Sequence, residues 1–119
     1  YSRSDLETLL DNINLSCFIK NKKGEYLYAN KRKCDFKEDK KEIIGCRAND
    51  LYDNVQELGY IENVENELIK RKEPFSTENV FTVDGEKKWY EVTLIVTLNE
   101  DKSVKNINIT SRNIDIRNT

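Results

Sequence analysis

The cysteines and carboxylates of this chain are the first residues to consider for nucleophilic or acid–base chemistry, and the chain contains no histidine. The lack of histidine excludes Ser/His and Cys/His nucleophile pairs, His-ligated zinc and haem, and a phospho-accepting histidine. Carboxylate pairs such as Glu38-Asp39, and Glu65 with Glu67, are expected to be solvated charges, since nothing positions them as an acid–base pair. The sequence contains no catalytic motif, so we predict no catalytic and no metal-ligating residues.

The cysteines, Cys17, Cys34 and Cys46, are an odd number at irregular spacing, and they form no Cys-x-x-Cys motif. With only one proline and no disulfide-framework spacing, this pattern favours reduced thiols. We therefore expect a cytoplasmic protein without a structural disulfide.

Length and charge limit the classes of function. The 119 residues suit one domain with one modest core. The net charge of −2 offers no basic surface for nucleic acid, and the lysine-rich patches Lys20 to Lys23 and Lys31 to Lys33 are expected to be solvated. No apolar run approaches a membrane span and no signal peptide is present, so we expect no membrane contact. Because Tyr1 is not an initiator methionine, the chain is expected to be a fragment of a longer protein.

The first element that could position other groups is a short N-terminal helix from Ser4 to Ile13. Ser4-Asp5-Leu6-Glu7 predicts a capping box, with Ser4 at the cap and Glu7 three residues later. Apolar side chains at helical spacing then mark one face: Leu6, Leu9, Leu10 and Ile13. So short a helix needs a surface on which to bury this face.

Two strand pairs and one long helix follow. Residues 17–30 predict a strand pair that turns at Lys22-Lys23-Gly24, because glycine tolerates positive φ. Apolar residues at steps of three and four predict the longest helix, roughly Val55 to Lys72, which Pro74 ends. A late hairpin turns at Asp84-Gly85 and returns as residues 104–116.

The strand that begins near Trp89 has two unequal faces. One face is wholly apolar and is expected to lie under the helices: Tyr90, Val92, Leu94, Val96 and Leu98. The opposite face still carries Trp89 and Ile95. The N-terminal helix or a second subunit is expected to cover that face.

The order and spacing of several short motifs resemble a PAS domain, the small sensory module of bacterial signalling proteins. The matching residues are Gly24 and Asn30 in the first strand pair, Glu42-Ile43-Ile44-Gly45, Asp50-Leu51-Tyr52, Glu73-Pro74, Asp84-Gly85 and Trp89. The resemblance implies an α+β fold, a five-stranded antiparallel sheet with helices on one face. Residues 1–14 would form the flanking N-terminal helix and residues 15–116 the PAS core.

The resemblance also implies a function, which is signal input or relay rather than catalysis. The output module would lie C-terminal to Thr119, as a histidine kinase or a diguanylate cyclase. Two alternatives remain open: a ligand-free structural dimerisation module and a stand-alone enzyme on a similar sheet.

The resemblance to the PAS family implies that one set of side chains faces the space between the sheet and the helices: Phe18, Ile61, Val64, Tyr90, Val92, Leu94 and Ser111. The hydroxyls of Tyr90 and Ser111 on an apolar wall are typical of a small-molecule pocket. The alternative is a filled core with two satisfied hydroxyls.

No flavin or haem is expected. The cysteine of the light-sensing flavin branch would fall on Ala48, and Cys46 lies too early. Flavin-contacting amides are replaced by Val80, Tyr90 and Ser111. The chain has no His or Met that could ligate haem iron, and nothing in the sequence indicates that a Cys thiolate does so.

The C-terminal end and the segment 31–41 depart from the family pattern. The usual Asp-Ile-Thr, which couples the domain to a following helix, becomes Asn113-Ile114-Asp115, or Asp115-Ile116-Arg117 in a slipped alignment. We therefore assign Asn113 and Asp115 to signal relay. The segment Lys31 to Lys41 is shorter and more charged than usual, which would alter one pocket wall.

A homodimer is expected to form through the N-terminal helix and the outer sheet face. The residues assigned to this interface are Leu6, Leu9, Leu10, Ile13, Trp89 and Ile95. Aromatic anchors such as Trp89 concentrate binding energy, and monomers rarely expose large apolar patches. The alternative is that the helix folds back and covers this face within one subunit.

Overall fold

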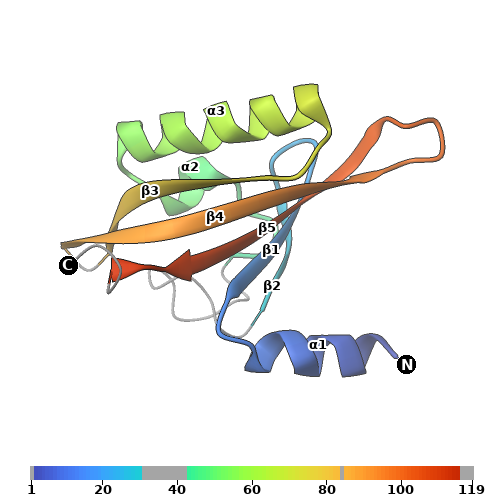
Figure 1. Cartoon of the computed structure of the whole chain (residues 1–119), viewed down its shortest axis with the longest axis horizontal. Coiled ribbons are helices and arrows are strands. Elements are labelled where there is room, and N and C mark those ends of the chain that lie inside the picture. Colours follow the sequence, from blue (N-terminus) through green and yellow to red (C-terminus); the bar gives the residue numbers. More distant parts are fainter. Residues whose placement is uncertain (1, 31–42, 84, 116–119) are drawn as a thin grey trace.

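One five-stranded antiparallel sheet forms the centre of the molecule. The computed structural model describes residues 2–30, 43–83 and 85–115. The elements in chain order are α1 (Arg3–Asn12), β1 (Ser16–Asn21), β2 (Tyr26–Ala29), α2 (Ala48–Leu51), α3 (Val55–Arg71), β3 (Phe75–Val83), β4 (Glu86–Leu98) and β5 (Val104–Asn113). The strand order is β2-β1-β5-β4-β3, and α2 and α3 lie on one face (Figure 1). The predicted α+β fold is thus confirmed.

Strands from the two ends of the chain lie side by side. β1 pairs antiparallel with β5, so that Phe18 is opposite Ile109. The predicted hairpin turns are present, with Gly24 at φ +85° and Gly85 at φ +80°, where side chains other than glycine are strained. Asp84 of the second turn lies outside the described residues.

The long helix α3 closely matches its predicted bounds. Asn54 caps it, because its side-chain oxygen accepts hydrogen bonds from the backbone N–H groups of Gln56 and Glu57 at 2.8 and 3.1 Å. At the other end Lys72 adopts the left-handed conformation and its N–H donates to Leu68. Within the described ranges, no helix has both the length and the apolar character needed to cross a bilayer.

The core is divided into two clusters of buried side chains. One lies between α3 and the strands β3 to β5, and consists of Leu68, Val83, Tyr90, Val92, Leu94 and Ile107. The other lies around β1 and β2, and consists of Phe18, Tyr26, Ala29 and Ile43. Ile109 packs against both clusters. This division places an open space at the centre of the inner sheet face.

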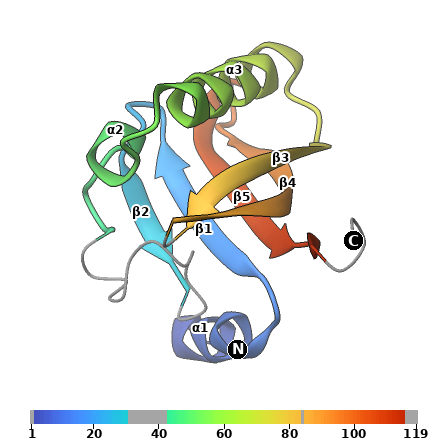
Figure 2. The same ribbon diagram turned by 90° about the vertical axis from the view of Figure 1, so that its left-hand side faces the viewer.

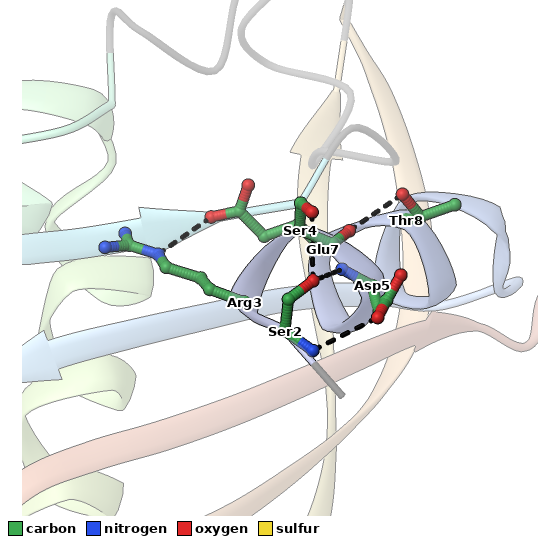
Figure 3. A network of polar contacts seen from close by, with 6 residues as sticks. All are labelled: Ser2, Arg3, Ser4, Asp5, Glu7 and Thr8. Atoms are coloured by element: carbon green, nitrogen blue, oxygen red, sulfur yellow. Dashed lines mark hydrogen bonds and ion pairs between the residues drawn. The ribbon is translucent and has the colours of Figure 1, made fainter.

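The start of α1 differs from the prediction by two residues, because Ser2 rather than Ser4 is the cap. The Ser2 hydroxyl accepts from the Asp5 backbone N–H at 3.2 Å, and the Asp5 carboxylate accepts from the Ser2 N–H at 3.1 Å (Figure 3). The predicted pair of Ser4 and Glu7 was wrong, since Ser4 lies inside the helix and Glu7 pairs with Arg3 at 3.2 Å. The helix ends at Asn12, with Ile13 as its C-cap.

Helix α1 lies on the side of the sheet opposite α3 (Figure 2). None of its side chains is fully buried. Of the predicted apolar face, Leu6 and Leu9 are 45% and 64% exposed, while Leu10 and Ile13 are partly buried. Trp89 and Ile95 on the outer sheet face are also exposed, at 41% and 46%. The helix therefore does not cover this face within one subunit.

Asn30 holds α1 to the sheet. Its side chain is fully buried, and its amide donates to the carbonyls of Leu10 and Leu15 at 2.6 and 2.8 Å. Its side-chain oxygen accepts from the Cys17 N–H at 2.9 Å. The end of α1, the following loop and the first residues of β1 therefore converge on one amide group.

We predict that Asn30→Ala lowers the free energy of unfolding by about 2–4 kcal/mol, because buried backbone groups at Leu10, Leu15 and Cys17 lose their partner. Urea unfolding followed by circular dichroism measures the change. Asn66→Ala on the exposed surface of α3 is the control and should alter stability by less than about 0.5 kcal/mol. Equal stability of the two variants would show that the Asn30 bonds contribute nothing.

Candidate ligand-binding cavity

A cavity of about 60 Å³ lies between the inner sheet face and α3, and it is partly open to solvent. Every strand contributes to its wall, as do α3 and the segment after α2. The lining residues are Phe18, Tyr26, Tyr52, Tyr60, Ile61, Val64, Glu65, Phe81, Val83, Tyr90, Val92, Leu94, Ile109 and Ser111. The cavity lies where the two core clusters meet, since members of both are in its wall.

All of the side chains predicted to face a ligand line this one cavity. They are Phe18, Ile61, Val64, Tyr90, Val92, Leu94 and Ser111. Of the positions compared with flavin-binding relatives, Tyr90 and Ser111 are in the wall. Val80 is not, because it pairs with Trp89 at the outer face. Whether the cavity holds a ligand stays a prediction.

Sequence reasoning missed the other half of the wall: Tyr26, Tyr52, Tyr60, Glu65, Phe81, Val83 and Ile109. Helical spacing could have found two of them, since Tyr60 precedes Val64 by four residues and Glu65 follows Ile61 by four. Strand alternation could have paired Phe81 with Val83. Tyr26 and Tyr52 depend on how separate segments pack, which no local pattern records.

Aromatic rings form most of the wall, and Phe81 is at their centre. Its ring contacts Tyr60 edge-on with 5.7 Å between centroids, Tyr90 edge-on at 5.9 Å, and Tyr52 at 5.9 Å. Across the cavity, Phe18 and Tyr26 form another edge-on pair at 5.7 Å. Flat, mostly apolar surfaces of this kind suit a planar ligand.

A buried ion pair between Lys20 and Glu65 corrects two expectations. Lys20 was predicted to be solvated, but it is 2% exposed, and its ammonium group contacts the Glu65 carboxylate at 2.7 Å. Glu65 was predicted to be a surface charge, but it lines the cavity. The Lys20 ammonium also lies over the Tyr26 ring at 4.8 Å from the centroid. Glu67 follows the prediction, since it is half-exposed and pairs loosely with Arg71.

A second polar group of the wall is the Tyr60 hydroxyl. It is buried and has no hydrogen-bond partner of normal geometry among the described residues. Burial raises the pKa of Tyr60, and an interaction with the Thr77 side chain opposes this rise. A buried, unpaired hydroxyl is unfavourable, so the cavity contains a polar group that a ligand could satisfy.

The residues assigned to signal relay form a small network where the chain leaves β5. The Asp115 carboxylate accepts from the Trp89 backbone N–H at 2.7 Å and from the Asn113 amide at 3.0 Å. The Ile114 N–H donates to the Trp89 carbonyl at 2.9 Å. These bonds hold the pKa of Asp115 below its usual value, the Trp89 bond having the largest effect. Ile116 and Arg117 of the slipped alignment lie outside the described residues.

The cysteines at positions 17 and 46 have no role in the cavity or the relay network. Neither Cys17 nor Cys46 is in a disulfide, and burial raises the pKa of Cys17, which disfavours the reactive thiolate. Cys34 lies outside the described residues. Among the residues that are described, no cluster of three or more Cys, Asp or Glu side chains could hold a metal ion.

The class of protein is defined by a curved antiparallel sheet with helices over one face and a small cavity between them. A family model described as the PAS fold matches residues 10–118, and the chain belongs to the PAS family. No curated protein matches the sequence.

Solved structures show the same fold at low sequence identity. The PAS domain of a protein from Colwellia psychrerythraea matches with a TM-score of 0.77 and 16% identity, over 93% of this chain and 95% of that one. A sensory box sensor histidine kinase from Vibrio cholerae matches with a TM-score of 0.67 and 13% identity, over 94% and 91%. VqmA of Vibrio cholera, solved with ligand and DNA, matches with a TM-score of 0.81 and 9% identity, over 95% and 52%.

We predict that the bonds of Asp115 make stability depend on acid pH. Because its pKa is lower in the folded than in the unfolded chain, Asp115 stabilises the fold above the unfolded pKa of about 4. This contribution is lost as pH falls through the folded pKa. Asp115→Asn should therefore flatten the fall of urea midpoint with acid pH, whereas Glu62→Gln, an exposed carboxyl on α3, should flatten it less. Parallel curves for wild type and Asp115→Asn would contradict the assignment.

Proposed function

We propose that this PAS domain binds a small molecule in the central cavity and relays its presence to an output module beyond its C-terminus. The observation that carries the proposal is the wall itself, which combines aromatic rings with a carboxylate and an unpaired hydroxyl. Mostly apolar pockets with a few orienting polar groups are typical of ligand sites. The structure of VqmA with a ligand provides support from a protein of the same fold.

The route of relay is short. The Tyr90 side chain lines the cavity, and the backbone of the preceding residue, Trp89, bonds to Ile114 and Asp115. Movement of Tyr90 upon ligand binding would shift these bonds at the point where the chain leaves the sheet. Asn113 supports the same carboxylate.

For the output module we favour a histidine kinase over a diguanylate cyclase, because a matching structure belongs to a sensor histidine kinase. The lack of a disulfide-framework pattern among the cysteines supports a cytoplasmic location. We also propose that the domain carries no flavin, since Cys46 and Ala48 are outside the cavity wall, and no haem, since the chain has no His or Met to ligate it.

We predict that Val64→Phe removes ligand binding by filling the cavity, at a stability cost of about 1–3 kcal/mol. Wild-type protein and variant are screened against one library of small ring compounds by NMR, using the methyl groups of the cavity wall. Asn63→Phe, on the exposed side of the same helix, is the control and should bind as wild type does. If no compound shifts the wall methyls of wild type, the domain is better described as a ligand-free dimerisation module.

We further propose that the occupant of the exposed leucine face of α1 and the outer sheet face is a second copy of this chain. The apolar side chains exposed there belong to one subunit's helix and strand: Leu6, Leu9, Trp89 and Ile95. Leu10 and Ile13, also assigned to the interface, are partly buried. A symmetric pair buries identical patches against each other, so one exposed face is enough to form the contact.

We predict that the chain is a dimer at micromolar concentration and that Leu6→Glu/Leu9→Glu converts it to a monomer, because two carboxylates would be buried at the contact. Light scattering coupled to size exclusion gives the mass. Thr8→Glu, on the same helix, is the matched control and should remain dimeric. A monomeric wild type would refute the dimer.

A further inference from the structure

The charged groups in the cavity wall limit the net charge of the ligand that the cavity can bind. Apart from tyrosines, Glu65 is the only titratable side chain of the wall among the described residues. Its charge is matched by the buried Lys20 ammonium, which contacts Glu65 Oε2 at 2.7 Å. An anionic ligand would face the carboxylate, and a cationic ligand would add a positive charge to a pair that is already balanced. The pair therefore favours a ligand without net charge.

The second carboxylate oxygen of Glu65 makes the cavity favour ligands that donate a hydrogen bond. Oε2 is occupied by Lys20, whereas Oε1 receives no hydrogen bond from any described residue. An ionised carboxylate can only accept hydrogen bonds. A ligand group that approaches Oε1 must therefore be a donor. The Tyr60 hydroxyl, unpaired in the same wall, can accept or donate and so imposes no choice of its own.

Size and shape give the remaining limits. At about 60 Å³ the cavity is less than half the size of the roughly 150 Å³ cavity that holds a benzene molecule, so a ligand larger than a single small ring requires the wall to rearrange. The wall presents the rings of Phe18, Tyr26 and Phe81 among others, which contact a planar molecule over its faces and edges.

We propose that the cavity recognises a small, uncharged, planar ring compound that donates a hydrogen bond from N–H or O–H to Glu65 Oε1. This inference rests on the proposed function, because it names the chemical class of ligand for the same cavity. Glu65 is thus the residue that determines specificity, and Lys20 is a positioning residue that holds its carboxylate.

Four five-membered ring compounds test this class of ligand on the whole chain. Pyrrole is uncharged and has an N–H donor, furan is uncharged and has none, pyrrole-2-carboxylate is an anion, and pyrrolidinium is a cation. Their binding is measured from NMR shifts of the Val64, Leu94 and Ile109 methyl groups in the wall, with Ile95 on the outer face as the off-site reference. We expect pyrrole to bind about tenfold or more tightly than furan, the gain from a hydrogen bond to a charged group. The two ions should bind more weakly than pyrrole.

The double variant Lys20→Met/Glu65→Met tests whether Glu65 causes the preference for pyrrole over furan. Removing both charges leaves neither one buried and unpaired, so the fold should be retained. Furan binding should persist, and the advantage of pyrrole should fall to about twofold or less. Glu67→Met/Arg71→Met, which removes an exposed pair from the same helix, is the control and should leave the preference unchanged.

The outcomes separate this inference from the function on which it rests. If furan or either ion binds as tightly as pyrrole, or if the double variant keeps the full preference for pyrrole, the proposed ligand class is wrong while the cavity remains a binding site. If none of the four compounds shifts the wall methyls but another compound of the ring library does, the ligand class is wrong; if no compound of either set does, ligand binding itself is refuted. The comparison of compounds on wild type decides the matter even where the double variant fails to fold.

Discussion

The buried contact between Lys20 and Glu65 fixes the distance between the sheet and the helix that covers it. A lysine ammonium this deeply buried requires an opposite charge beside it, because an unpaired charge in the interior is strongly destabilising. A second bond, from the Thr82 N–H to the Glu57 carboxylate at 2.6 Å, holds the start of α3 to β3. The two attachment points are about 12 Å apart along the helix. Ile61 and Val64, which line the cavity, lie between them. The cavity is therefore open because α3 is held by polar bonds at two points on either side of it.

Local patterns in the sequence predict much of the fold, because the sheet and α3 follow hydrophobic periodicity. The long helix and the late hairpin depend on spacing and on turn glycines, both of which are visible in a short stretch of sequence. The burial of Lys20 cannot be read from a short stretch of sequence, because Lys20 lies in the same polar run as Lys22 and Lys23. Its partner is 45 residues away, so only the packing of α3 on β1 distinguishes it from its neighbours. The same reasoning explains why the inward-facing residues Tyr90, Val92 and Leu94 were predicted from strand alternation, whereas the pairing of Glu65 with a buried lysine was not.

Helix α1 shows how a polar contact can override an amphipathic pattern. Its leucines predicted a buried apolar face, yet Glu7 and Asp11 are partly buried while Leu9 is exposed. Burial raises the pKa of Tyr28 in β2, and the carboxylates of Asp11 and Glu7 raise it further. Asn30 accounts for this placement, since its amide bonds position the end of the helix independently of its apolar side chains. The leucine face is consequently left available for other contacts.

Trp89 gives the domain a natural optical probe of its C-terminal end. It is the only tryptophan of the chain, and its indole is partly exposed while its backbone holds Ile114 and Asp115. Four of the six tyrosines, by contrast, line the cavity. Tryptophan emission therefore reports on the exit of the chain from the sheet, and tyrosine emission reports mainly on the cavity. Excitation at the red edge of the absorption band selects the tryptophan, so this end of the chain can be followed by itself in the unlabelled protein.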